Sequence, residues 1–380
     1  MKRILFVLPY YKIGGTLTSF VNLIPLIDTT QYCIDAYALT NTVDDFSILP
    51  TSVNYIGLKN TGKDLKKSQC RVKSFLLHIF KTFKKMSIFL GYDPADVVFR
   101  KMALKLSDKY DIVIAFQEGQ ASRMAQYISA PYKIAWIHCM YSRFKTSNNA
   151  CYINVYNNFD KIVCVSNTAA KEMQDFEPQW NDKICVVYNA INLDLVSKQA
   201  LSHVHFDKKI NIVSVGRIDP VKGFSAIPSI AKRLQQSGLE FDWWIIGGVA
   251  VPNEYKKIVD NIKDNEVSNC VHLTGPLSNP YPYIKSSNLL VCLSSSETFN
   301  YTIAEAKVLG TPVITTDFSC AFEFVENEKS GLILPIDKIS EGIIRILGDN
   351  QLYNNIQSYL LSNCRNKNLT VEQFETLLNI

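Results

Sequence analysis

The sequence lacks the features by which membrane-spanning, zinc-binding and disulfide-stabilised proteins are recognised. None of its apolar runs is long enough to cross a bilayer. Its ten cysteines are scattered without a Cys-x-x-Cys pair, and its five histidines form no cluster at metal-ligand spacing. These absences argue against a zinc site and a disulfide framework, and they favour a reduced, cytoplasmic setting.

The first apolar segment, Ile4–Leu8, follows two basic residues and so begins like a signal peptide. Pro9 and the pair Gly14 and Gly15 interrupt the sequence before a full apolar region is complete. We therefore interpret Ile4–Leu8 as the first strand of a folded domain.

Length and charge both divide the chain into two parts. The 380 residues are enough for two domains with separate cores. Residues 1–200 carry a net charge of +8 and residues 201–380 carry −3, which gives the total of +5. A basic first part predicts an anionic partner there, either a membrane surface or an acceptor molecule.

One stretch carries the clearest chemical pattern. Leu289–Leu293 is an uninterrupted apolar run, typical of a strand buried on both faces of a parallel sheet. A polar loop follows, and then a short helix that Gly310 and Pro312 end before the next strand begins at Val313. In such strand-loop-helix units the loop lies at the ligand crevice, and the first amides of the helix can bind an anion.

Two carboxylates, Glu297 and Glu305, stand eight positions apart in this stretch. Glu297 lies in the loop and Glu305 about two turns into the helix, so they need not share a face. We therefore interpret them as holding two ends of one elongated ligand rather than as an acid/base pair acting on one atom. An ordinary solvated pair on a surface helix is the alternative.

This pattern resembles the retaining glycosyltransferases of family 4, which have the two-domain GT-B fold. Their signature is two glutamates separated by seven residues, an aromatic residue two positions after the first, and a Gly-Thr-Pro-Val-Ile tail, here residues 310–314. The resemblance implies that Glu297 faces the donor sugar and that Glu305 holds the ribose hydroxyls of the nucleotide. Asn300 stands where the family usually has Gly or Pro, and Asn is a favourable helix N-cap.

A second motif delivers two cations into one loop. The strand Ile210–Val215 is followed by Arg217 and Lys222, which suit a diphosphate through bidentate hydrogen bonding and a point charge, respectively. Cations placed where negative charge grows stabilise the transition state more than the ground state. Both residues match the phosphate-binding pair of family 4, and a structural salt bridge is the alternative.

The pair Gly14 and Gly15 allows backbone amides to approach a phosphate closely, although a plain turn is the common explanation. The resemblance implies that this loop caps the donor diphosphate and opens onto the acceptor. The same resemblance assigns further residues to the donor site, namely Gly216, Gly247, Thr274, Gly275, Thr298, Phe299, Asn300, Tyr301 and Thr302.

Strand ends in the first 200 residues carry further candidates. His138 ends one expected strand, and a lone His is more often structural than catalytic. Because family 4 has a His at this place that touches the donor sugar, the resemblance adds His138 to a catalytic set with Arg217, Lys222 and Glu297. It assigns to the acceptor side Glu118, Ser166 and Asn189.

Two other signals in the first part of the chain have alternatives. Gly57–Lys63 fits the P-loop pattern, but Asp64 stands where a magnesium-binding Ser or Thr is required, so we interpret a surface loop. Residues 63–90 combine an apolar stripe with many lysines, which is typical of a helix on an anionic membrane. A helix packed on its own domain with a solvated lysine face is the alternative.

The resemblance and the order of the motifs predict an α/β protein with the GT-B fold. Two Rossmann-like domains are expected to face each other across a nucleotide-sugar cleft, with the acceptor-binding domain over residues 1–200 and the donor-binding domain over residues 201–365. A polar linker is expected at about Asp194–Lys209. A C-terminal helix, residues 366–380, is expected to pack back on the first domain.

The sequence has no Asp-x-Asp motif, so a metal-clamped diphosphate site is not expected, and no metal or other cofactor is required. The resemblance implies sugar transfer with retention of configuration from a nucleotide diphosphate sugar, with a UDP-sugar favoured. The expected acceptor is a glycan or a polyprenyl-diphosphate-linked saccharide, in the synthesis of capsule, O-antigen or a similar cell-surface polysaccharide.

The expected location is the cytoplasm, with peripheral attachment to the inner membrane face if residues 63–90 bind lipid, and no nucleic-acid partner is expected. Two alternatives stay open. A UDP-sugar 2-epimerase shares the GT-B architecture, and a catalytically silent subunit would bind nucleotide without turnover. The presence of Arg217, Lys222, Glu297 and Glu305 argues against a silent subunit.

Overall fold

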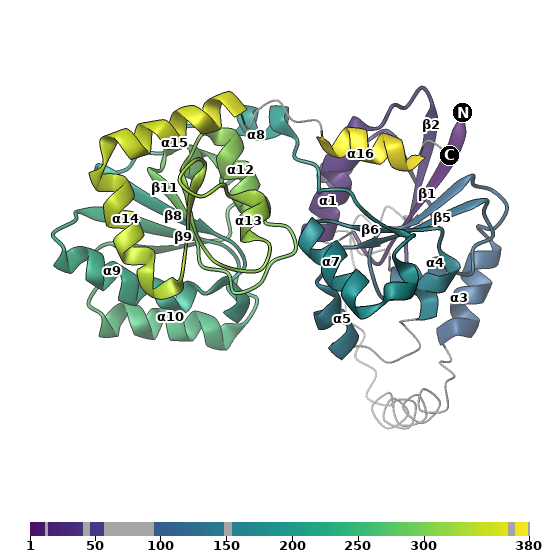
Figure 1. The fold of residues 1–380 in the computed structure, drawn as a ribbon, viewed down its shortest axis with the longest axis horizontal. Coiled ribbons are helices and arrows are strands. Elements are labelled where there is room, and N and C mark those ends of the chain that lie inside the picture. The colour runs from purple at the N-terminus through teal and green to yellow at the C-terminus, as the bar shows by residue number, and fades with distance from the viewer. Residues whose placement is uncertain (12–13, 41–45, 57–94, 148–153, 364–368, 379–380) are drawn as a thin grey trace. The chain divides into compact units, whose positions relative to one another are not determined.

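The computed structural model describes residues 1–11, 14–40, 46–56, 95–147, 154–363 and 369–378. The signals at Gly57–Lys63 and at residues 63–90 lie outside these ranges. The chain forms two compact units: unit 1 contains Met1–Ala190 and Gln373–Ile380, and unit 2 contains Ile191–Glu372 (Figure 1). Each unit has a parallel sheet covered by helices, which confirms the predicted α/β class and its Rossmann-like domains.

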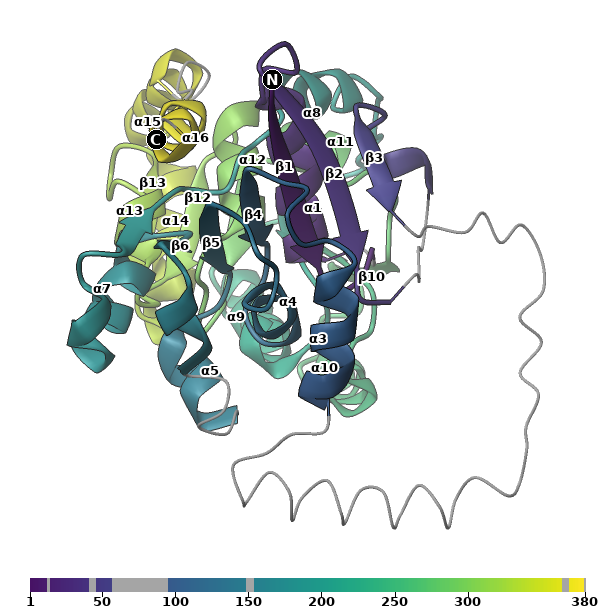
Figure 2. The same ribbon diagram turned by 90° about the vertical axis from the view of Figure 1, so that its right-hand side faces the viewer.

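Seven parallel strands among the described residues form the sheet of unit 1, in the order β3-β2-β1-β4-β5-β6-β7 (Figure 2). The strands are β1 (Lys2–Leu8), β2 (Tyr32–Ala38), β3 (Val53–Ile56), β4 (Ile112–Ala115), β5 (Tyr132–Ile137), β6 (Lys161–Cys164) and β7 (Ile184–Val186). Residues Ile4 to Leu8 are fully buried, because a central parallel strand is covered on both faces. Their uninterrupted apolar run follows from this position.

Helices cover both faces of the unit 1 sheet. One face carries α3 (Ala95–Leu104), α4 (Gln120–Ala125), α5 (Tyr141–Ser147) and α7 (Asn167–Phe176). The other carries α1 (Gly15–Leu23) and α16 (Leu369–Leu378). The ring of Phe20 in α1 lies edge-on to Phe6 and Phe116, with centroids 5.4 and 5.9 Å away. Four short 3-10 helices complete the described part of the unit, η1 (Ile24–Leu26), η2 (Phe46–Ile48), η3 (Asn154–Asn158) and η4 (Pro178–Trp180).

In the described part of unit 2, six parallel strands have the order β10-β9-β8-β11-β12-β13. Their bounds are β8 (Ile210–Val215), β9 (Phe241–Ile246), β10 (Val271–Gly275), β11 (Leu289–Cys292), β12 (Val313–Thr316) and β13 (Gly331–Leu334). The 3-10 helices are η5 (Pro220–Lys222), η6 (Phe224–Ala226) and η7 (Ile336–Lys338). As in unit 1, the first strand lies inside the sheet and the order reverses beside it.

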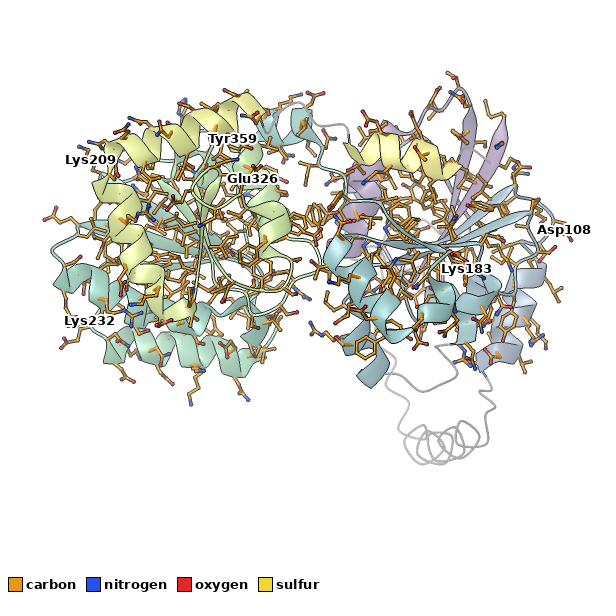
Figure 3. All side chains as sticks on the ribbon, in the orientation of Figure 1. Asp108, Lys183, Lys209, Lys232, Glu326 and Tyr359 are labelled. Carbon is orange, nitrogen blue, oxygen red and sulfur yellow. The ribbon has the colours of Figure 1, made fainter. Side chains whose placement is uncertain are left out.

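The helices of unit 2 lie on two faces of its sheet. Val291 belongs to a core shared with α9 (Ile227–Gln236), α10 (Pro252–Asp264) and α14 (Ile339–Gly348). Its neighbour Cys292 points to the other face, where it meets α12 (Tyr301–Leu309) through its N-cap. The remaining helices are α8 (Leu193–Gln199), α11 (Tyr281–Ser286), α13 (Ala321–Phe324) and α15 (Asn350–Asn363). Tyr359 of α15 donates its hydroxyl to Glu326 at 2.7 Å, and both side chains are labelled in Figure 3.

The two units divide between Ala190 and Ile191, earlier than the boundary expected after residue 200. The linker expected at Asp194–Lys209 is wrong in its first half, because α8 forms there. Asn192 caps this helix, whose buried Val196 lets it pack on unit 2, against α11 and α12. The expected donor domain, residues 201–365, therefore begins too late to include α8.

The chain returns to unit 1 within its last helix, α16. The side-chain oxygen of Gln373 accepts a hydrogen bond from the backbone N of Tyr188 at 3.0 Å. The next residue, Phe374, packs against Trp136 with ring centroids 6.0 Å apart. In the described ranges, no helix has the length and apolar character needed to cross a membrane.

Candidate functional site

The candidate donor site of unit 2 lies where the strand order reverses, at the carboxyl ends of β8 and β11. Open α/β sheets bind ligands at such a switch point. The loops after these two strands are joined, since the backbone N of Ser295 donates to the carbonyl oxygen of Val221 at 2.8 Å. Gly223 has φ +68°, and a Cβ there would overlap the carbonyl oxygen of Leu293. Glycine is therefore required for the two loops to approach each other.

Lys222 and Glu297 meet across this junction. The ammonium of Lys222 lies 2.5 Å from Oε1 of Glu297, and both side chains are largely buried. Ser294 donates its hydroxyl to the same carboxylate oxygen at 2.7 Å. Thr316, at the end of β12, donates its hydroxyl to the carbonyl oxygen of Ser294. The predicted cation and the first glutamate of the motif are thus held together at the ends of three strands.

Arg217 lies in the same loop as Lys222 but is much more exposed. Its side chain is 74% exposed, and one guanidinium nitrogen lies 3.7 Å from Asp219 Oδ2. Asp219 in turn caps η5 by accepting from the backbone N of Lys222 at 3.2 Å. A guanidinium this exposed can turn toward a bound anion without first losing a buried partner.

Asn300 is the N-cap of α12, as its sequence position predicts. Its side-chain oxygen accepts from the backbone N of Ile303 at 3.0 Å, and its side-chain nitrogen donates to Cys292 Sγ at 3.2 Å. The hydroxyl of Thr302 donates to the carbonyl oxygen of Val215, 3.4 Å away, so the start of α12 is tied to the end of β8. The first amides of α12 have no carbonyl partner within the helix. They therefore lie beside the loop that carries Arg217 and Lys222, which is called the cation loop below.

The other residues expected in this loop have different surroundings. Phe299 packs its ring against Tyr301 and Phe324, with centroids 5.0 and 4.9 Å away, so its described contacts are apolar. Thr298 precedes it in the same loop and is half-buried. These contacts give Phe299 a packing role in shaping the loop.

Glu305 lies in the second turn of α12 and is 9% exposed. Tyr281, the first residue of α11, donates its hydroxyl to Glu305 Oε1 at 3.0 Å. Burial raises the pKa of the Glu305 carboxyl to about 7, against the opposing effect of this hydrogen bond. A carboxyl group in this state is partly protonated at neutral pH.

The glycines that follow β8 and β9 and the glycine that ends β10 pack against one another. The backbone N of Gly216 donates to Ile246 O at 2.9 Å, and the backbone N of Gly247 donates to Gly275 O at 3.0 Å. A Cβ at Gly247 would overlap the carbonyl oxygen of Gly216, so this close approach requires glycine. Thr274 uses its hydroxyl within the loop, donating to Gly275 O at 2.9 Å. Gly216, Gly247, Thr274 and Gly275 thus lie together at one edge of the candidate donor site.

The candidate residues of unit 1 lie at the carboxyl edge of its own sheet. Gly14 is the N-cap of α1, and Gly15 is its first residue. A Cβ at either glycine would meet no atom within 4 Å, so the backbone there is open to a ligand. The switch point of this sheet lies between β1 and β4, next to this loop.

His138 follows β5 and is half-buried. Its ring lies 5.0 Å from Phe116 and stacks on Trp136 at 6.5 Å. Burial lowers the pKa of His138 to about 3, so the imidazole is neutral at physiological pH. Among the residues that the structure describes, its buried Nε2 has no hydrogen-bond partner. A neutral His138 can form a hydrogen bond with a ligand, but it cannot supply a positive charge.

The three candidates for acceptor binding have partners within unit 1. Glu118 accepts from the backbone N of His138 at 2.8 Å and so fixes the end of β5. Ser166 is fully buried and caps α7 by accepting from Ala169 N at 3.3 Å. Asn189 is buried and accepts from the hydroxyl of Ser19 at 2.6 Å. These contacts are structural, and an acceptor contact by any of the three stays a prediction.

Two family descriptions match the chain one after the other. The model for "Glycosyltransferase Family 4" matches residues 67–195, and the model for "Glycosyl transferases group 1" matches residues 197–360. The chain belongs to glycosyltransferase family 4. The second match covers all the candidate residues of unit 2, from Gly216 to Glu305.

Curated relatives of this family 4 chain are glycosyltransferases of bacterial glycans. One is the N-acetylgalactosamine-N,N'-diacetylbacillosaminyl-diphospho-undecaprenol 4-alpha-N-acetylgalactosaminyltransferase of Campylobacter jejuni, 27% identical over 44% of this chain and 45% of that enzyme. Another is the lipopolysaccharide core biosynthesis glycosyltransferase LpsE of Rhizobium meliloti, 24% identical over 64% of this chain and 68% of that enzyme. The matched part of the chain thus spans about half of the first relative and about two thirds of the second.

Solved structures share the fold over the whole chain. Anabaena HepE in complex with UDP-glucose has a TM-score of 0.72 at 16% identity, covering 100% of both chains. TarM of S. aureus has a TM-score of 0.74 at 13% identity, covering 100% of this chain and 99% of that one. These similarities confirm the GT-B fold predicted for this family 4 chain.

Sequence reasoning about family 4 motifs missed the side chains that hold the two glutamates. Ser294 and Thr316 could have been found from the sequence, because they stand close to the motif, just after β11 and at the end of β12. Tyr281 was not, because it stands 24 positions before Glu305 in a separate helix, and no periodicity links the two. The Cys320 thiol, which donates to Glu297 O at 3.1 Å, gave no signal either.

Proposed function

We propose that the chain is a retaining glycosyltransferase that transfers a sugar from a nucleotide diphosphate sugar to a glycan or lipid-linked saccharide. The observation that carries the proposal is the junction of Arg217, Lys222 and Glu297 beside the start of α12. The two cations and the helix N-terminus at this junction support a diphosphate site, and the adjoining carboxylate supports a sugar site next to it. A sugar diphosphate matches this order of charges along its length.

The proposed mechanism places the leaving group against fixed positive charge. As the glycosidic bond breaks, negative charge grows on the diphosphate, and Arg217, Lys222 and the α12 amides stabilise it without a metal. Lys222 exchanges its contact with Glu297 for the diphosphate, which leaves the carboxylate available to the sugar hydroxyls. The departing phosphate accepts the proton of the acceptor hydroxyl on the same face, so the configuration is retained and no covalent nucleophile is required.

Donor and acceptor classes are proposed from the relatives. HepE was crystallised with UDP-glucose, which supports a UDP-sugar as donor. The C. jejuni relative is named for a diphospho-undecaprenol substrate and LpsE for lipopolysaccharide core biosynthesis. The proposed role is therefore in the synthesis of a cell-surface polysaccharide, such as capsule or O-antigen. The net positive charge of residues 1–200 supports work on a lipid-linked acceptor at the inner membrane face.

Thermal unfolding in the absence of divalent metal tests the donor site. The purified chain would be heated with UDP-, GDP-, ADP- and CMP-sugars and with the free nucleotides. We expect one nucleoside diphosphate to raise the Tm at saturating concentration, because ligands stabilise the state that binds them. Arg217→Ala should abolish this shift, since it removes the exposed cation of the loop. Arg345→Ala is the matched control, because Arg345 is an exposed arginine of unit 2 paired with Glu328.

The outcomes separate the proposal from its rivals. No shift with any nucleotide, or an equal loss in both arginine variants, would contradict the donor site and favour a silent subunit. Conversion of the nucleotide sugar without any acceptor would identify a 2-epimerase. A β-linked product from an α-linked donor, seen by NMR, would rule out retention.

A further inference from the structure

Tyr281 and Glu305 form a buried pair from two separate helices of unit 2. The Tyr281 hydroxyl donates to Oε1 of Glu305 at 3.0 Å, and the glutamate is 9% exposed. Within the described residues, the second carboxylate oxygen, Oε2, has no hydrogen-bond partner. Unlike the buried unpaired atoms of the protein, such as Nε2 of His138, Oε2 is not fully enclosed. Oε2 therefore reaches solvent while Oε1 is already held.

Tyr281 is fixed in place from both sides. Asn279 accepts from the backbone N of Tyr281 at 3.2 Å and donates its amide to Gln199 O, at the end of α8, at 2.8 Å. Farther along α11, Ile284 O accepts from the hydroxyl of Thr311, just after α12, at 2.8 Å. Helix α11 is thus fastened to both neighbours, and the Tyr281 hydroxyl sets the plane of the Glu305 carboxyl group.

No cation compensates the Glu305 carboxylate within the described part of unit 2. The titratable groups on α12 and on the elements packed against it are Tyr301, Lys307, Tyr281, Tyr283, Lys285, Asp194, Lys198, Tyr353, Tyr359 and Cys292. Of these, Tyr281 alone acts on the carboxyl group. Lys307, two residues farther along α12, is directed elsewhere and donates to Phe324 O at 2.6 Å. The carboxyl therefore depends on a ligand for any further hydrogen bond to its charged form.

We propose that Tyr281 is a positioning residue for the nucleotide ribose: it holds Oε1 of Glu305 so that Oε2 accepts the ribose hydroxyls, and binding releases a proton from this carboxyl group. The inference rests on the proposed nucleotide-sugar donor. A protonated Glu305 carries its hydrogen on Oε2, because Oε1 is occupied as an acceptor. That hydrogen must leave to solvent before Oε2 can accept from a ribose hydroxyl. Binding therefore releases a proton from each chain in which Glu305 is protonated, so fewer protons are released per nucleotide as the pH rises.

The test compares UDP with 2′-deoxy-UDP on the full chain by titration calorimetry. The ratio of their dissociation constants isolates the ribose contact, because ionisation of the phosphate is common to both ligands. For the unmodified chain at pH 8 we expect UDP to bind about tenfold or more tightly than 2′-deoxy-UDP. This ratio corresponds to the free energy of one hydrogen bond to a charged group. The ratio should fall toward one at pH 6, where the carboxyl is protonated.

Three variants assign the effect to its residues. Tyr281→Phe should lower the ratio at pH 7 and move its pH midpoint upward, because the hydrogen bond that favours the ionised carboxyl is lost. Glu305→Gln should give a small ratio that no longer depends on pH. Tyr283→Phe is the matched control, since Tyr283 lies on the same helix with its ring against Trp244 and Phe206. It should behave like the unmodified chain.

The results separate this inference from the proposed function. If UDP, GDP, ADP and CDP all fail to bind the unmodified chain, the donor site itself is wrong. If UDP binds and Tyr281→Phe keeps the same ratio and the same pH midpoint, the positioning role is overturned while the donor site stands. Unchanged far-ultraviolet circular dichroism in Tyr281→Phe would show that the variant is folded.

Discussion

Glu305 is a residue at which the fold and the proposed ligand favour opposite protonation states. Burial raises the pKa of its carboxyl to about 7, whereas a ribose diol would favour the ionised form. In the ligand-free chain this carboxyl group costs stability whenever it is charged. Such a cost at a residue without a counter-ion is characteristic of a group kept for binding rather than for folding.

Glu305→Gln should therefore raise stability at alkaline pH. The folded carboxyl binds a proton up to about pH 7 and the unfolded one only up to about 4.5, so the free energy of unfolding falls as pH rises between these values. The neutral side chain of Gln does not titrate, so the free energy of unfolding of the variant does not fall in this way as the pH rises. We expect the variant to be more stable by on the order of 1–3 kcal/mol at pH 8 and close to the unmodified chain at pH 4.5.

Urea unfolding at the two pH values measures this difference. Glu341→Gln is the control, because Glu341 is an exposed glutamate paired with Lys338 at 2.8 Å. An equal effect of Glu305→Gln at both pH values would show that the carboxyl group is not titrating in the folded chain.

At the scale of elements, α12 carries the amides that the proposed diphosphate needs. Its first turn is held by the side chain of Asn300, which bonds both Ile303 N and Cys292 Sγ. Family 4 usually has Gly or Pro at this place, so this chain adds a side-chain cap to the proposed anion site. A stable first turn keeps the amides oriented before the ligand arrives.

Variants of Asn300 separate the cap from the charge. Asn300→Ala should lower stability by about 1 kcal/mol and weaken donor binding, because the first turn loses its cap. Asn300→Asp keeps the oxygen that caps Ile303 N but places a negative charge beside the phosphates, so it should weaken binding more than Asn300→Ala does. Thermal unfolding with and without the nucleotide measures both quantities. Full donor binding by Asn300→Asp would show that the diphosphate does not lie at the start of α12.

The elements that the sequence predicts well are those whose signal is local. Buried parallel strands such as Ile4–Leu8 produce uninterrupted apolar runs, and the caps Asn300 and Ser166 stand directly before their helices. The family motif adds the prediction that Glu297, Glu305 and the cation loop belong to one site. All of these depend on neighbours within a few positions or on a fixed pattern of spacing.

What the sequence does not predict depends on long-range packing. Helix α8 lies in a mainly polar segment and gives no clear apolar periodicity. This seven-residue helix buries one apolar residue, Val196, where it packs on α11 and α12. The contact of Tyr281 with Glu305 joins two helices through tertiary structure alone. The role of Asn189 as the buried partner of Ser19 is equally invisible before its neighbour is known.

At the scale of the whole molecule, the first and the last residues of the chain fold into the same unit. Unit 1 combines Met1–Ala190 with the last residues from Gln373, and Phe374 supplies a 3% exposed ring to the core around Trp136. Trp136 stacks on His138, so the packing of the final helix extends to the candidate edge of unit 1.

Phe374→Ala should destabilise unit 1 by about 3 kcal/mol, because a buried ring is lost beside Trp136. Hydrogen exchange should accelerate at the amides of β5 in unit 1 and stay unchanged at those of β8 in unit 2. Phe322→Ala is the control, since Phe322 is a largely exposed phenylalanine of unit 2. Equal acceleration in β5 and β8 would contradict separate stability of the two units.

The division of the chain also fixes an order of events during synthesis on the ribosome. Unit 2 is one continuous segment, Ile191–Glu372, whereas unit 1 is completed only by residues that follow it, from Gln373 onward. Unit 1 begins to emerge first, yet the part of α16 that covers Trp136 is translated after all of unit 2. The nascent protein therefore carries an uncovered apolar sheet face for the whole time that unit 2 is being translated, and this face is where a chaperone would be needed.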